Sequence, residues 1–190
     1  DPAEGIDEVE RHRDRMKNSA DALDFQFDRH AARNELQAAT FGRKRRAMVR
    51  LLLSRTGSMA IQLKHYDDPE DVPVRVAVRP LPVEPSDFRL RYKTTDRRFL
   101  DLIRQQAGEY ETLFVDPDGQ LTEGSRTSLF VEREGKLLTP PLSRGLMPGI
   151  LRGKLIDEGR AEEAELTPAD LEDGFFIGNI VRGLIPAKLA

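Results

Sequence analysis

Apolar residues in the first part of the chain recur at a helical period with charged residues between them, which predicts two helices. The first helix would bury Val9, Met16, Ala20 and Leu23. Asp28 is of a type that caps helix N-termini, and Gly42 is of a type that ends helices. Between them the second helix would place its apolar residues Ala31, Ala32, Leu36 and Ala39 on one side.

Shorter apolar runs follow and predict strands. Residues 48–53 and 59–63 lie on either side of a turn at residues 56–58, which is the pattern of a β-hairpin. Residues 74–78 carry valine at every second position and predict a third strand.

Prolines then interrupt the pattern. Pro80, Pro82 and Pro85 disfavour a helix or a central strand, so residues 81–87 are expected to form an extended interdomain linker. This linker would join a small N-terminal α/β domain, residues 1–80, to a larger C-terminal domain, residues 88–190.

The second part of the chain mixes helical and strand periods and predicts an α+β fold. Helices are expected over residues 97–107 and from Pro148, which suits a first helical turn, to about residue 158. Strands are expected at residues 111–115, 127–132, 136–138, 174–177 and 183–185, with a turn at residues 116–119 between the first two.

Composition excludes several function classes. The 190 residues contain no cysteine, which removes disulfides, thiolate nucleophiles, iron–sulfur clusters and thiolate zinc sites. The three histidines lie too far apart for a metal-ligand spacing, so no metal site is expected. The net charge of −3 argues against a nucleic-acid partner, and the basic run at residues 43–46 is interpreted as a solvated loop. No apolar run approaches the roughly 18 residues of a membrane helix, and a cytoplasmic protein is expected.

Three segments combine reactive side chains with loop chemistry. Lys93 lies at the entrance to an apolar helix, where it is either an ordinary surface lysine or a nucleophile toward carbonyls. Glu123, followed by the small residues Gly124 and Ser125, either caps a hairpin or pairs with a cationic ring nitrogen. Residues 139–152 form a Gly- and Pro-rich loop that runs into a helix, either as a tight loop or as a phosphate site at the helix start.

An amine, a carboxylate and a phosphate-binding helix start are together what pyridoxal phosphate requires. The lysine forms a Schiff base, the carboxylate keeps the pyridine nitrogen protonated, and the helix N-terminus holds the phosphate. The three segments therefore indicate a site for this cofactor and a small-molecule substrate.

These residues, in this order, resemble the fold-type IV (class IV) pyridoxal-phosphate enzymes over nearly the whole chain. Residues 10–20 resemble the N-domain element of that family with the pattern HxxRL…SA. By position, Lys93 resembles the Schiff-base lysine and Glu123 the partner of the pyridine nitrogen. The other cofactor-binding residues that the resemblance implies are Arg15, Gly149, Ile150, Asn179 and Ile180.

The resemblance also implies an architecture. It predicts a class IV aminotransferase-like fold with two α/β domains, a cofactor-binding C-terminal domain and a homodimer. The family normally begins with a strand and a loop ahead of the helix that contains His12. Here that region would fall before Asp1, so an N-terminal segment is expected to be missing.

Within the family, two segments resemble the 4-amino-4-deoxychorismate lyases, which release pyruvate to form the folate precursor 4-aminobenzoate. They are KTTDR at residues 93–97 and the GN.VRGLIPA pattern at residues 178–187. Branched-chain aminotransferases usually carry a tyrosine five residues after the lysine, where this chain has Arg98. An aminotransferase of branched-chain or D-amino acids is the alternative, and a non-catalytic relative is a third reading. Arg50 is a weaker candidate for binding a substrate carboxylate, or else a strand-edge arginine that faces water.

Overall fold

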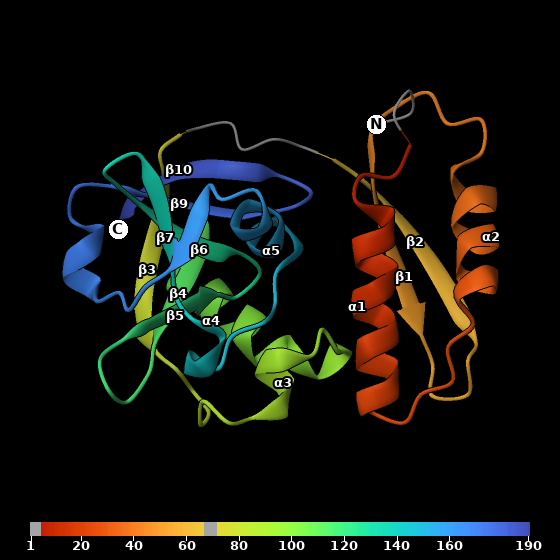
Figure 1. Cartoon of the computed structure of the whole chain (residues 1–190), viewed down its shortest axis with the longest axis horizontal. Helices are drawn as coiled ribbons and strands as arrows, with labels where there is room; N and C mark the ends of the chain where they lie inside the picture. Colours follow the sequence, from red (N-terminus) through yellow and green to blue (C-terminus); the bar gives the residue numbers. More distant parts are fainter. Residues whose placement is uncertain (1–4, 67–71) are drawn as a thin grey trace. The chain divides into compact units, whose positions relative to one another are not determined.

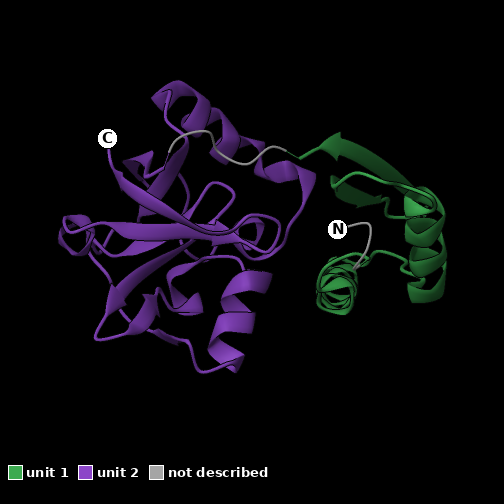
Figure 2. Cartoon of the chain, turned by 90° about the horizontal axis from the view of Figure 1, so that it is seen from above, with its two compact units in different colours: residues 1–68 green, residues 69–190 purple. Residues whose placement is uncertain are grey.

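The computed structural model describes residues 5–66 and 72–190. The chain divides into two units, Asp1–Asp68 and Pro69–Ala190, which are coloured separately in Figure 2. Each unit is built from the helices and strands labelled in Figure 1. None of the helices in the two described ranges has the length and the apolar character needed to cross a membrane.

The first unit contains two helices and a β-hairpin, as the hydrophobic pattern predicts. Its elements are α1 (Val9–Ala22), α2 (Arg29–Thr40), β1 (Ala47–Leu53) and β2 (Met59–His65). Asp28 caps α2, because its carboxylate accepts hydrogen bonds from the N–H groups of His30 and Ala31. β1 and β2 pair antiparallel, and Gly57 in the turn between them has a φ of 89°, a conformation that favours glycine.

An eight-stranded mixed sheet, which curls in Figure 1, forms the centre of the second unit. Its strands are β3 (Val74–Pro80), β4 (Glu111–Val115), β5 (Leu121–Gly124), β6 (Ser128–Arg133), β7 (Lys136–Thr139), β8 (Ala161–Glu163), β9 (Phe175–Asn179) and β10 (Gly183–Leu189). They lie in the order β5-β4-β3-β10-β9-β6-β7-β8. β3 pairs parallel with β4 and with β10, and β7 pairs parallel with β8, whereas the remaining pairs are antiparallel.

Helical segments connect these strands. They are α3 (Phe88–Arg91), η1 (Thr95–Arg97), α4 (Arg98–Ala107), η2 (Leu142–Arg144), α5 (Ile150–Asp157) and η3 (Pro168–Leu171), where η marks a 3-10 helix. Neighbouring residues on a strand point to opposite faces of the sheet. Leu113 and Leu129 therefore lie in the main core, while Phe114 packs with α4 and Phe130 packs with α5. Burial of side chains of this size stabilises the fold by about 1.5–3 kcal/mol each.

The boundary between the two units differs from the predicted one. β3 pairs with β4 and β10, so it belongs to the second unit, and the division falls after Asp68 and not at residue 80. The Pro-rich residues 81–87 connect β3 to α3 inside the second unit and are not an interdomain linker. Valine alternation predicts a strand but says nothing about the sheet that the strand joins.

Two local expectations also differ from the structure. The turn at residues 116–119 joins β4 to β5, a strand that the pattern does not predict, and not to the strand at residues 127–132. Pro148 precedes α5, which begins at Ile150 with Gly149 as its N-cap. The other helix and strands predicted for this half are confirmed as α4, β4, β6, β7, β9 and β10.

Candidate active site

Glu123, in β5, is a buried carboxylate whose hydrogen bonds fall on one oxygen. Its Oε1 atom accepts a bond of 2.8 Å from Nη2 of Arg97 and a bond of 3.1 Å from the backbone N–H of Met147. Both charged side chains are nearly enclosed, with 9% of Glu123 and 11% of Arg97 exposed. No residue within 5–66 or 72–190 donates a hydrogen bond to Oε2, so one acceptor of this carboxylate is open.

Opposing effects set the charge state of Glu123. Burial raises the pKa of this carboxyl group, while the Arg97 guanidinium, the Met147 N–H group and the charge of Lys93 act to lower it. Lys93 thus lies close enough to Glu123 for their charges to interact. Lys93 lies in the short segment between α3 and η1 and is exposed, so burial does not hold its side chain. The next residue, Thr94, has a buried hydroxyl without a hydrogen-bond partner among the described residues.

The start of α5 lies against the same group of residues. Gly149 donates its N–H to the carbonyl of Met147 at 2.8 Å, so this predicted phosphate donor already has an acceptor. A Cβ atom at Gly149 would lie 2.6 Å from Oγ of Ser128, so only glycine lets α5 approach β6 this closely. The N–H of Ile150, the first in the helix, has no intrahelical acceptor and lies at the positive end of the helix dipole.

Asn179, at the end of β9, organises the turn into β10. Its Oδ1 atom accepts from the N–H groups of Val181 at 3.1 Å and Arg182 at 3.2 Å. Its Nδ2 atom donates to the carbonyl of Arg126 at 3.3 Å, which ties this turn to the segment that follows β5. Ile180 is partly buried and packs with the apolar residues around α5.

A second buried carboxylate, Glu111, braces the segment between β5 and β6. Its Oε1 atom accepts from the N–H of Thr112 at 2.9 Å and from the N–H and the hydroxyl of Ser125 at 3.0 and 2.6 Å. Its Oε2 atom accepts from the hydroxyl of Thr127 at 2.9 Å and from the N–H of Arg126 at 3.3 Å. The residue is fully buried, and its contacts hold residues 125–127 in one conformation.

These contacts connect the predicted residues of the second unit into one group. Lys93 acts on Glu123 through its charge, and Glu123 accepts a bond from Met147. The carbonyl of Met147 in turn accepts from Gly149, the N-cap of α5, while Asn179 bonds the segment that follows β5. Residues that are far apart in the sequence thus form a contiguous site.

Arg15 and Arg50 belong to the first unit. Arg15 lies in α1, and its carbonyl accepts a bond of 2.9 Å from the hydroxyl of Ser19. Arg50 is the exposed residue of β1 and lies opposite Gln62 of β2. Their roles toward a phosphate and a substrate carboxylate stay predictions.

Three members of the group, Arg97, Glu111 and Ser128, are not predicted by the sequence analysis. Arg97 directly precedes α4, where the helix dipole disfavours a cation, and a residue that breaks a local rule often serves a site. Glu111 opens a strand whose other members are apolar residues and a threonine, which is a weaker signal. Ser128 gives no signal, because its role depends on its contact with Gly149.

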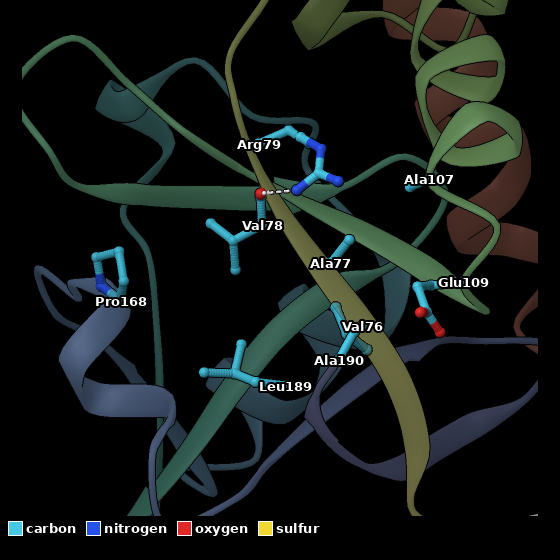
Figure 3. A pocket seen from close by; sticks show the side chains of 9 residues that line it. All are labelled: Val76, Ala77, Val78, Arg79, Ala107, Glu109, Pro168, Leu189 and Ala190. Atoms are coloured by element: carbon cyan, nitrogen blue, oxygen red, sulfur yellow. Dashed lines mark hydrogen bonds between the residues drawn. The ribbon is translucent and has the colours of Figure 1, made fainter.

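A separate pocket of about 360 Å³ lies beside β3 (Figure 3). It contains none of the predicted site residues and is lined by residues 76–79 and by Ala107, Glu109, Pro168, Leu189 and Ala190. Its two charged side chains are engaged, Arg79 with the carbonyl of Val78 at 2.9 Å and Glu109 with Arg75 at 3.2 Å. In the part of the chain that the structure describes, no group of three or more His, Asp or Glu side chains is arranged to hold a metal ion.

The connected group offers three chemical functions. Lys93 supplies an amine, Glu123 a buried carboxylate with an open oxygen, and Ile150 an N–H at a helix start. A cationic ring N–H suits the open carboxylate oxygen, and a phosphate suits the helix start. Pyridoxal phosphate carries both of these groups together with a carbonyl that an amine can attack. The residues present therefore fit this cofactor.

Known proteins resemble this chain in sequence and in fold. Residues 4–190 match the family model described as Amino-transferase class IV. The crystal structure of a "Putative amino-acid aminotransferase" from Mesorhizobium loti has a TM-score of 0.88 and 34% identity, covering 96% of this chain and 91% of that one.

Two curated relatives carry different names. The "Probable branched-chain-amino-acid aminotransferase" of Thermotoga maritima is 27% identical over 94% of this chain and 70% of its own length. The "Putative aminodeoxychorismate lyase" of Schizosaccharomyces pombe is 24% identical over 80% of this chain and 68% of its own length. Because the family model extends over nearly the whole sequence and agrees with the chemistry of the site, this chain belongs to the class IV aminotransferase family of pyridoxal-phosphate-dependent enzymes.

Proposed function

We propose that this protein binds pyridoxal phosphate and converts 4-amino-4-deoxychorismate into 4-aminobenzoate and pyruvate. The observation that supports the cofactor most strongly is the carboxylate of Glu123. It is buried, accepts two hydrogen bonds on Oε1 and keeps Oε2 open, and the charge of Lys93 acts on this carboxyl group. This is the arrangement that a protonated pyridine nitrogen requires.

Each residue has a defined task in this proposal. When bound, the cofactor supplies a ring that accepts the electron pair left on the substrate carbon. Lys93 holds the cofactor at rest, and its Nζ atom then takes the proton from the substrate carbon that bears the amine. Glu123 keeps the ring nitrogen protonated through Oε2. The N–H of Ile150 binds the phosphate. Arg15 stays the candidate for the phosphate that the family resemblance implies, and Arg50 stays the candidate for a substrate carboxylate.

The lyase reaction is favoured by Arg98, the residue that follows the KTTDR segment at residues 93–97. The position five residues after Lys93 is Arg98, where branched-chain aminotransferases usually carry tyrosine. The alternative is an aminotransferase, and it is supported by the names of the relatives from Mesorhizobium loti and Thermotoga maritima. The proposal also includes a role in forming a folate precursor, assembly as a homodimer and a location in the cytoplasm.

The cofactor is tested by absorption spectroscopy of the full chain with added pyridoxal phosphate. We expect a near-violet band that borohydride abolishes, with the cofactor then fixed covalently on Lys93. Lys93→Ala should lack the band. Lys136→Ala is the matched control, because Lys136 is an exposed lysine of β7 paired with Glu162, and it should keep the band. A band that persists in Lys93→Ala would contradict the assignment.

The reaction is tested on the loaded protein with two substrates. A lyase should form fluorescent 4-aminobenzoate and one equivalent of pyruvate from 4-amino-4-deoxychorismate. An aminotransferase should instead convert the cofactor to its amine form when it is given an amino acid alone. Conversion by an amino acid without any 4-aminobenzoate would favour the alternative.

A further inference from the structure

The guanidinium of Arg97 joins two parts of the candidate site. Its Nη2 atom donates to Oε1 of Glu123 at 2.8 Å, and its Nη1 atom lies 3.3 Å from the sulfur of Met147. The backbone N–H of Met147 donates to the same Glu123 oxygen at 3.1 Å. The three residues therefore form a closed triangle of contacts between η1, β5 and the loop that leads into α5.

We propose that Arg97 is a positioning residue for the reaction. It fixes Oε1 of Glu123 and holds that carboxylate as an anion, so that Oε2 is left for the ring N–H of the cofactor. This inference rests on the proposed pyridoxal-phosphate function. Arg97 acts through Glu123 and needs no contact with the substrate.

The reason for a partner is the burial of Glu123. A carboxylate that is removed from water without a compensating charge becomes neutral, because desolvation favours the protonated acid. A neutral acid would present a hydroxyl in place of an acceptor and would not keep a ring nitrogen protonated. Glu123 therefore needs a nearby cation to serve the cofactor.

Two cations act on Glu123 within the described residues, namely Arg97 and Lys93. Lys93 is the exposed one, and a covalent bond to the cofactor would use its amine. Arg97 then remains as the cation that keeps Glu123 ionised. Its bond to Oε1 also stops the carboxylate from rotating, since Met147 N–H holds the same atom.

The first test measures the charge of Glu123 in the full chain without cofactor. The protein is labelled with ¹³C at the glutamate carboxyl groups, titrated by NMR, and the Glu123 signal is identified as the one missing in Glu123→Gln. Arg97→Met should raise the pH midpoint of this signal by about 1–3 units, the usual influence of an adjacent arginine on a carboxyl group. Arg89→Met is the matched control. Arg89 lies in α3 and pairs with Asp87, the N-cap of that helix, so its removal should leave the Glu123 midpoint unchanged.

The second test measures the dissociation constant of pyridoxal phosphate by absorption titration. Arg97→Met should weaken binding by about 10- to 100-fold, the value of a hydrogen bond to a charged group. In a Glu123→Gln background the same substitution should cause no further loss, because Arg97 acts through Glu123. Arg97→Lys keeps the charge and should recover most of the midpoint, and it also supplies the test if Arg97→Met does not fold.

An unchanged Glu123 midpoint in Arg97→Met would overturn the proposal. The proposal would also be overturned if Arg97→Met weakened cofactor binding as much in the Glu123→Gln background as in the wild-type protein. An arginine with a merely structural role would behave in that way. Failure of the proposed function would give a different result, because the wild-type protein would then lack a Lys93-dependent absorption band. The NMR titration needs no cofactor, so it would still show whether Arg97 sets the charge of Glu123.

Discussion

Two buried carboxylates lie on the neighbouring strands β4 and β5, and the protein holds them in opposite ways. Glu111 accepts hydrogen bonds through both oxygens, and four of its five donors belong to residues 125–127. Glu123 accepts through one oxygen, and its two donors, Arg97 and Met147, come from distant parts of the chain.

This difference separates a structural carboxylate from one that is available to a ligand. Glu111 cannot accept a bond from a ligand without giving up a bond to its own loop. Glu123 keeps an unused acceptor and a cationic partner that compensates its burial. Burial of a charged group is therefore a poor indicator of function by itself, and unused hydrogen-bonding capacity is a better one.

The same substitution at the two sites gives the largest expected contrast. Glu111→Gln replaces one accepting oxygen by an NH₂ group, which then faces hydrogen-bond donors in a buried site. This should lower the free energy of unfolding by about 2–5 kcal/mol. Glu123→Gln keeps an acceptor oxygen for Arg97 and Met147 but leaves the nearly enclosed guanidinium of Arg97 without a counter-charge, so its cost should be smaller, about 1–3 kcal/mol. Its effect should appear in the affinity for pyridoxal phosphate. Urea unfolding and a cofactor titration of both variants check this, and equal destabilisation would remove the distinction.

A methyl group added beside Glu111 gives the next largest effect. A Cβ atom at Gly124 would lie 2.5 Å from Oγ1 of Thr127 and 2.9 Å from Cδ of Glu111. Gly124→Ala should therefore lower the free energy of unfolding by about 1–3 kcal/mol.

Gly153 in α5 is the matched control, because a Cβ atom there meets nothing within 4 Å. Gly153→Ala should raise the stability by about 0.4–1 kcal/mol, since alanine favours the helix. Thermal unfolding of the two variants gives the comparison, and a neutral Gly124→Ala would mean that the Glu111 network yields easily.

The smallest effect is a difference in the sign of the pH dependence. Burial raises the pKa of Glu123, so the folded protein binds its proton more readily than the unfolded chain does. The contribution of this group to stability should fall as the pH rises from the unfolded value of about 4.3 through the higher folded value.

Asp170, in η3, supplies the opposite case. The N–H of Thr167 lowers the pKa of this carboxyl, so its contribution is complete above the unfolded value of about 3.9 and is lost as the pH falls through the folded value. Unfolding free energies of the wild-type protein, Glu123→Gln and Asp170→Asn between pH 2 and 8 test both directions. Slopes of the same sign for the two groups would show that burial does not dominate at Glu123.

Much of the fold follows from local patterns. The two helices of the first unit, its hairpin and the strand β3 are predicted correctly, since their periods are set by neighbouring residues. Strand β5 is missed because its residues include a glutamate and a glycine, which rarely mark a strand, and it forms by pairing with β4. The boundary after Asp68 is missed for the related reason that β3 pairs with strands that follow it in the chain.

Residue types and local order are enough to predict which chemistry is available here, namely an amine at Lys93, a carboxylate at Glu123 and a helix start after the Gly- and Pro-rich loop. How these groups are supported depends on contacts that form in the folded protein. The tertiary structure showed that Arg97 pairs with Glu123, that Glu111 holds the adjoining loop and that the amide of Gly149 is already used. The physical reason is that hydrogen bonds and charge compensation depend on which strands and helices meet in space, and such contacts between distant residues leave no periodic trace in the chain.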